Sequence, residues 1–133
     1  VASGECGIAI ANTYYLARLA ASEDPQDQAV AAAVGIVFPD QAGNGTHVNI
    51  SGAGLVKTAP NPENAIRFLE YLASDQAQSL FADGNHEYPV VSGIAATSTV
   101  VALGDFAEDS INTSEFGVNQ AAALMVFDRA GWK

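Results

Sequence analysis

Two adjacent tyrosines, Tyr14 and Tyr15, are the residues of this chain whose type and position best suit ligand chemistry. They follow a short apolar run at residues 8–11 and open a stretch in which apolar residues recur at helical spacing. Asn12 and Thr13, just before them, are residue types that cap helix starts. Because unpaired amides and the helix dipole favour negative charge at such a start, we expect a phenol there to ionise more easily than in bulk water.

Paired phenols at one position point to a cation. An unperturbed tyrosine titrates near ~10, and two neighbouring phenolates repel each other. A hard trivalent metal that binds both oxygens would remove this penalty. The alternative is that one ring packs in the core and the other lies at the surface, which is the common role of aromatic side chains. Taken alone, the dipeptide leaves both interpretations open.

The remaining candidate ligands are isolated in the sequence. His47 and His86 have no second ligand at metal-binding spacing, so we predict structural roles for both. Tyr88 precedes a proline, which favours a packing role over that of a third phenolate. The one cysteine, Cys6, excludes an intrachain disulfide and a thiolate metal cluster, and its place beside an apolar run predicts a small buried residue.

No catalytic motif supports an enzyme. The chain lacks a G-x-S-x-G elbow, an H-E-x-x-H pair and a phosphate-binding loop with its lysine. Residues 51–54 are rich in glycine but have neither the lysine nor the helix that a phosphate loop needs. The three sequons, at Asn44, Asn49 and Asn112, match a pattern so short that chance accounts for them.

Composition bounds the class of protein and its partners. The 133 residues, 49% of them hydrophobic, suit one domain or part of a larger one. A net charge of -10 opposes binding to nucleic acid and to anionic membrane surfaces and is compatible with a cationic ligand. No apolar run approaches the ~20 residues of a membrane span. Because Val1 is not Met and the strand pattern begins within a few residues, we expect a mature or cleaved piece of a longer protein.

The elements that must position the tyrosines can be predicted from periodicity and from start and stop signals. Helices are expected at residues 15–20, 29–34, 61–73, 74–84, 97–103 and 118–127, with Gly131 ending the last one. Strands are expected at residues 8–11, 35–38, 46–57 and 87–91. Gly52 and Gly54 indicate a bulge or a hinge within the third strand.

Five segments in one order carry a resemblance to a known family. They read GECGIAIANTYY, FPDQAGNGTHVNISGAG, APNPENAIRFLEYLASDQAQ, NHEYPV and DRAGWK. Together they resemble the C-terminal part of ferric-iron-binding periplasmic proteins, which are the solute-binding components of bacterial ferric iron ABC transporters. The resemblance extends over essentially the whole chain.

This resemblance implies a fold. The family has an α/β, two-lobed periplasmic solute-binding protein fold (type II), with the ligand in the cleft between the lobes, and this chain would be its C-terminal part. Residues 1–36 would belong to the C-terminal lobe, residues 37–94 would form a crossing strand and part of the N-terminal lobe, and residues 95–133 would be the C-terminal helices of the C-terminal lobe.

The resemblance also implies a function and a site. The chain would bind ferric iron, Fe(3+), through the phenolates of Tyr14 and Tyr15, with Asn12 near the metal or a synergistic anion. The other iron ligands would lie in a missing N-terminal portion of the same protein. The iron would pass from the periplasm to an ABC permease in the inner membrane, with no chemistry on a substrate and no contact with nucleic acid.

Two other functions are compatible with the same fold. In the first, Asn12, Thr13 and the helix start hold an oxyanion or another small ligand, and the tyrosines only line the pocket. In the second, the chain is a regulatory or structural interaction domain without a ligand site.

Overall fold

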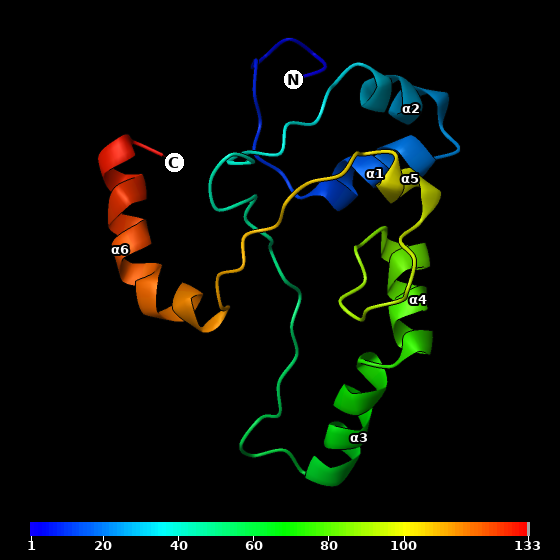
Figure 1. Ribbon diagram of the computed structural model, residues 1–133, viewed down its shortest axis with the longest axis vertical. Coiled ribbons are helices and arrows are strands. Elements are labelled where there is room, and N and C mark those ends of the chain that lie inside the picture. Colours follow the sequence, from blue (N-terminus) through cyan, green and yellow to red (C-terminus); the bar gives the residue numbers. More distant parts are fainter. Residues whose placement is uncertain (133) are drawn as a thin grey trace. The chain divides into compact units, whose positions relative to one another are not determined.

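The computed structural model describes residues 1–132, and its elements in this range are helical (Figure 1). The helices are α1 (Thr13–Ala21), α2 (Pro25–Ala32), α3 (Pro62–Leu72), α4 (Asp75–Asn85), α5 (Ser98–Val101) and α6 (Ser114–Ala130). None of these helices combines the length and the hydropathy that crossing a bilayer requires.

Local side-chain chemistry explains where most helices begin. Asp24 accepts a hydrogen bond from the amide of Gln26, so α2 starts at Pro25 and is longer than predicted. Ser74 and Thr97 accept in the same way from first-turn amides of α4 and α5. The six predicted helices are therefore confirmed, although α2 and α6 each begin four residues earlier than expected. For α6 the reason is that the loop before it already turns.

The predicted strands at residues 8–11, 35–38, 46–57 and 87–91 are wrong for the part of the chain that is described. Within residues 1–132, the β-pairing that forms is an isolated parallel bridge between Thr46 and Glu108. A strand needs a hydrogen-bonded neighbour, and none of the four segments lies beside another described segment in a ladder. Apolar side chains of the first segment consequently stay exposed.

The described residues form two compact units. One consists of Val1–Val37 with Asn49–Asp105, and the other consists of Phe38–Val48 with Phe106–Lys133, whose final residue lies outside the described range. The assignment of residues 1–36, 37–94 and 95–133 to particular lobes stays a prediction.

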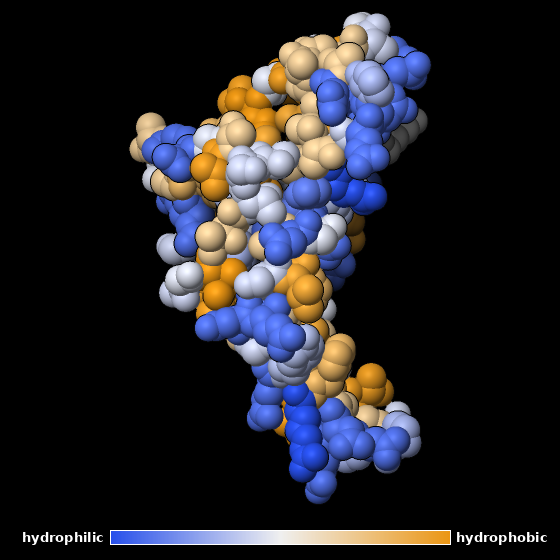
Figure 2. All heavy atoms as spheres, turned by 90° about the vertical axis from the view of Figure 1, so that its right-hand side faces the viewer, coloured by the Kyte–Doolittle hydropathy of each residue, from blue (hydrophilic) through white to orange (hydrophobic). Residues whose placement is uncertain are grey.

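Small side chains let the helices of the first unit approach closely. Helix α1 packs against α2 and α5, and Ala17 of α1 and Val100 of α5 are fully buried. Ala77 and Ala82 are the buried apolar residues of α4. Larger apolar side chains remain at the surface, where Figure 2 shows them as orange patches between blue polar residues.

A buried amide fastens the segment that follows α4. Gln78 is 8% exposed, and its Nε2 donates to the carbonyl of Leu72 at 2.8 Å. Its Oε1 accepts from the amide of Val90 at 2.9 Å. Both ends of the side chain are thus satisfied, and the segment runs back alongside α4 (Figure 1).

In the second unit, Gln41 ties two segments together. Its Nε2 donates to the carbonyl of Ala107 at 3.0 Å and to Oγ1 of Thr46 at 2.8 Å, while its Oε1 accepts from the amide of Ala107 at 2.7 Å. Phe38 stacks on Phe106 with ring centroids 4.4 Å apart. The contacts with Phe106 and Ala107 join residues that are more than sixty positions apart in the chain, whereas Thr46 lies five residues from Gln41.

We predict that Gln41→Ala loosens this connection. Because the side chain is exposed, water replaces part of what is lost, and the expected cost is about 1 kcal/mol. Native-state hydrogen exchange of the Ala107 amide should become roughly fivefold faster. Gln76→Ala on the exposed surface of α4 is the matched control and should leave this amide unchanged. Equal exchange in all three proteins would show that the Gln41 bridge does not form in solution.

Candidate functional site

Tyr14 and Tyr15 lie in the first turn of α1 and touch each other. Their ring centroids are 4.3 Å apart and the ring planes are inclined by 44°. Tyr14 is half-buried, and Tyr15 is 51% exposed. Neither phenol is locked inside a core, so two oxygen atoms stand side by side within reach of solvent and of a ligand.

The hydrogen bond with Tyr14 raises the pKa of Tyr15, and the negative charge of an ionised Tyr14 raises it further. Desolvation adds to this effect, and the guanidinium of Arg18 opposes it. The expectation of easy ionisation at the helix start is therefore wrong for Tyr15, because the adjacent phenol outweighs the helix dipole. A cation that takes up both oxygens has to displace a proton held in this pair.

Asn12 occupies the capping position of α1 without capping it. Its backbone is extended, and its side chain makes no hydrogen bond to the first turn. Instead, its Oδ1 accepts from Nδ2 of Asn49 at 3.1 Å. The predicted capping role of this side chain is wrong because a residue from a distant segment competes for its oxygen. The first turn also has no acidic residue and no side-chain cap, so it favours a negatively charged group, although the amide of Tyr15 already donates to the carbonyl of Asn12 at 3.3 Å.

Asn49 is a contact that sequence reasoning missed. In the sequence it stands out only as part of a sequon, and it lies 37 positions from Asn12. No local pattern signals that these two amide side chains meet. The pairing fixes the orientation of Asn12 directly before the two tyrosines.

A pocket of about 230 Å³ lies beside Tyr14. The other residues that line it are Arg18, Asn85 and Glu87. Arg18 stands one turn after Tyr14, so the two side chains share a face of α1. The spacing of four residues on a helix indicates that Arg18 lies beside Tyr14. The approach of Asn85 and Glu87 depends instead on the path of the chain at the end of α4 and after it.

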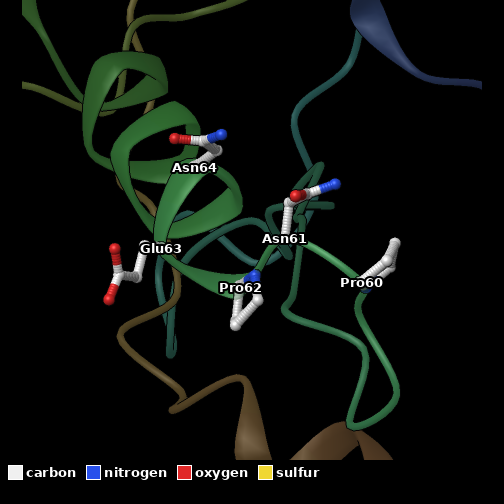
Figure 3. A pocket seen from close by; sticks show the side chains of 5 residues that line it. All are labelled: Pro60, Asn61, Pro62, Glu63 and Asn64. Carbon is white, nitrogen blue, oxygen red and sulfur yellow. The ribbon is translucent and has the colours of Figure 1, made fainter.

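A second pocket, of about 250 Å³, surrounds the start of α3. It is lined by residues 60–64, and Figure 3 shows the side chains of Pro60 and Glu63 pointing to opposite sides of it. These five residues include no phenol, imidazole or thiol. Its one carboxylate, from Glu63, and the amides of Asn61 and Asn64 are hard oxygen donors, but a single charged group is too few for a tight metal site.

Neither histidine has a ring contact or hydrogen bond with the tyrosine pair in the described part of the chain. The ring of His47 meets the edge of Phe116 with centroids 5.1 Å apart, as expected for a structural histidine. His86 ends α4, and its buried Nδ1 has no hydrogen-bond partner within residues 1–132. In the same range, no group of three or more histidine, cysteine, aspartate or glutamate side chains is placed to hold a metal.

The prediction for Tyr88 agrees with the structure, whereas the prediction for Cys6 is wrong. Burial raises the pKa of Tyr88, and the charge of Asp105 adds to the effect, so this phenol is held neutral, as suits a packing role. Cys6 was predicted to be buried but is exposed, and its Sγ accepts from the amino group of Val1 at 3.6 Å. The apolar run beside it is itself uncovered in the described part of the chain, which removes the basis for burial.

The chain is similar in sequence to bacterial solute-binding proteins and to iron uptake proteins. The sequence pattern of the family "Bacterial extracellular solute-binding protein" matches residues 1–79. The whole chain is 47% identical to Iron uptake protein A1 of Synechocystis sp. and covers 37% of it. It is 46% identical to Iron uptake protein A2 of the same organism and covers 39% of that protein.

Solved structures agree with these relatives. A Trichodesmium protein in complex with iron and citrate matches with a TM-score of 0.92 and 56% identity, over 100% of this chain and 42% of that one. The ferric binding protein from Campylobacter jejuni matches with a TM-score of 0.91 and 36% identity, over the same shares. The chain thus spans about two fifths of their length, and the predicted two-lobed α/β fold is confirmed as the fold to which it contributes.

We predict that Tyr15 ionises late in the metal-free protein. A spectrophotometric titration of tyrosinate should show a component above the ordinary pKa of 10.0, because the Tyr14 hydrogen bond and charge raise the pKa of Tyr15. Tyr15→Phe should remove one tyrosine from the late component and leave the one from Tyr88. A late component of equal size in the Tyr15→Phe protein would contradict the assignment.

Proposed function

The chain belongs to the bacterial extracellular solute-binding protein family, and we propose that it is the C-terminal part of a member that captures ferric iron. The observation that carries this proposal is the contact between Tyr14 and Tyr15 at an uncapped helix start. It is supported by 47% identity to an iron uptake protein and by the fit to a structure solved with iron and citrate.

The chemistry of the pair suits a hard trivalent ion. Phenolate oxygen is a hard donor, and ligands must lose their protons to bind a metal. Two phenolates side by side are unfavourable without a cation, and a ferric ion between them turns repulsion into attraction. The net charge of -10 adds a long-range field that attracts cations to the chain.

We place a synergistic anion at the start of α1. The first-turn amides have no side-chain cap, and the helix dipole favours negative charge there. Asn12, held by Asn49, stands at this end of the helix. An anion at this position would lie next to the tyrosine oxygens and complete part of the metal's coordination.

Two phenolates fill only part of the shell of a ferric ion, so further ligands are needed. We propose that they come from the N-terminal portion that the relatives have and this chain does not span. Exposed apolar side chains on and after α6 support a further segment that covers them: Val118, Leu124, Met125, Val126, Phe127 and Trp132. The affinity of the chain alone should be far below that of the whole protein.

Capture would serve transport and not catalysis. In this proposal the protein works in the periplasm and delivers ferric iron to an ABC permease in the inner membrane. Binding of the ion would shift an equilibrium between open and closed lobes, and the closed form would dock on the permease. The family description as extracellular solute-binding proteins supports this location and role.

Ferric titration of the chain, expressed with the coding sequence upstream of residue 1, tests the proposal. We expect a visible charge-transfer band that saturates with iron, because phenolate coordination transfers charge to the ferric ion. Tyr14→Phe and Tyr15→Phe should each weaken the band and lower the affinity by at least about tenfold. Tyr71→Phe is the matched control and should behave as the wild type.

A protein that gives no band and no ferric binding by equilibrium dialysis would overturn the ferric proposal and favour the anion-binding alternative. Binding without a band, unaffected by both substitutions, would place the metal away from the tyrosine pair.

The affinity for ferric iron should fall as the pH falls. Each phenol that binds the metal releases a proton, so protons compete with the ion, and two released protons would change the affinity by up to about 100-fold per pH unit. Competition with a chelator of known pH dependence measures this effect at fixed free iron. An affinity that is flat between pH 5 and 8 would contradict phenolate ligation. The raised pKa of Tyr15 keeps this phenol protonated throughout that pH range in the metal-free protein, so binding has to release its proton.

A further inference from the structure

Asn12 has the backbone of a capping residue, but its side chain does not cap α1. Its backbone angles (φ -71°, ψ 145°) lie in the extended region that a capping residue adopts. Asparagine is also among the side chains that cap helices best. Even so, the side chain makes no hydrogen bond to the first turn of α1. Something other than the backbone therefore keeps the oxygen of Asn12 away from the helix.

The other helix starts of the chain provide a comparison. Three helices begin with an extended backbone and a side chain that accepts from a first-turn amide, and these capping residues are Asp24, Ser74 and Thr97. Asn61 and Thr113 do not cap α3 and α6, but their backbones lie outside the extended region. Among the helix starts of residues 1–132, Asn12 is thus the one that combines a capping backbone with a side chain that does not cap.

A partner from another segment accounts for the difference. Nδ2 of Asn49 donates to Oδ1 of Asn12 at 3.1 Å, and Oδ1 is the atom with which an asparagine caps a helix. The two residues are 37 positions apart, and both belong to the first compact unit. Asn49 is exposed, so its replacement by a smaller residue would release Oδ1 of Asn12 without leaving a cavity.

The first turn of α1 has a donor for the released oxygen. The amide of Tyr15 donates to the carbonyl of Asn12 at 3.3 Å, whereas the amide of Tyr14 makes no hydrogen bond within residues 1–132. Tyr14 occupies the second position of the helix, where a capping oxygen commonly accepts its bond, as it does at the start of α2. The bond to Asn49 and a cap on Tyr14 are therefore alternatives for one oxygen atom.

We propose that Asn49 is a positioning residue that keeps α1 uncapped beside the tyrosine pair, and that it acts through Asn12. An uncapped helix start turns its positive dipole end toward the phenolates, and a carbonyl oxygen bonded there would offset part of this dipole. Asn49 thus maintains the electrostatic setting in which two phenolates bind a ferric ion, and the helix forgoes a cap that would stabilise it. The inference rests on the proposed ferric function and adds a residue outside α1 on which that function depends.

Hydrogen exchange and ferric titration of the protein expressed with its upstream coding sequence test the inference. In metal-free Asn49→Ala, the amide of Tyr14 should exchange about fivefold more slowly than in the wild type, because the released oxygen of Asn12 caps it. A bond that only supported the structure would have the opposite effect, since its loss would speed exchange. The ferric affinity of Asn49→Ala should fall about threefold, because the cap offsets part of the helix dipole.

A double substitution tests whether Asn49 acts through Asn12. Asn12→Ala removes both the bond to Asn49 and the side chain that could cap. Adding Asn49→Ala to this variant should change neither the exchange of the Tyr14 amide nor the ferric affinity any further. Asn49→Ser, with a shorter polar side chain, is a second variant in case Asn49→Ala does not fold. Asn64→Ala, on the exposed surface of α3, is the matched control and should behave as the wild type in both measurements.

The outcomes distinguish this inference from the proposed function. If the wild-type protein binds no ferric iron, both fall. If it binds iron, but Asn49→Ala leaves exchange of the Tyr14 amide unchanged or faster, no cap is withheld, and the inference is overturned while the ferric function stands. The inference is also overturned if exchange slows but Asn49→Ala and Asn49→Ser bind ferric iron like the wild type, or if Asn49→Ala keeps its full effect in the Asn12→Ala protein.

Discussion

Two neighbouring phenolates repel each other unless a cation lies between them, and the proposed site depends on this constraint. In the absence of a cation, Tyr14 and Tyr15 share a hydrogen bond, and the pKa of Tyr15 rises. The phenol of Tyr15 consequently keeps its proton more firmly, and in the proposed function a hard metal ion displaces it. The uncapped helix start beside the pair and the guanidinium of Arg18 one turn away both favour negative charge, which suits the proposed anion and not the metal itself.

Amide side chains hold the surroundings of this pair in place. Asn49 orients Asn12 before α1, and Gln78 holds the segment that carries Glu87. The amide of Asn49 bonds to Asn12, and the amide of Gln78 bonds to Leu72 and Val90. These neutral hydrogen bonds fix the surroundings of the pair, and neither Arg18 nor Glu87 takes part in them. The guanidinium of Arg18 and the carboxylate of Glu87 line the pocket beside Tyr14 without being part of these amide contacts.

Much of the local structure could be predicted, and the errors have a common cause. Ser74 and Thr97 stand at predicted helix starts because their side chains cap the amides that follow them, and Asp24 does the same for α2, four residues before the expected start. The strand at residues 8–11 and the burial of Cys6 were wrong for one reason, which is that both need a neighbouring segment to cover or pair with them. Hydrophobic pattern indicates what a segment prefers to contact, but it does not supply the contact.

The sequence by itself determined the helices, the tyrosine pair at the start of α1 and the face that Arg18 shares with Tyr14, because these follow from interactions within a few residues. Only the tertiary structure decided that Asn12 bonds to Asn49 instead of capping its helix, and that Glu87 closes a pocket beside Tyr14. These contacts join residues tens of positions apart. They depend on the path of the chain between the residues, which local propensities do not determine.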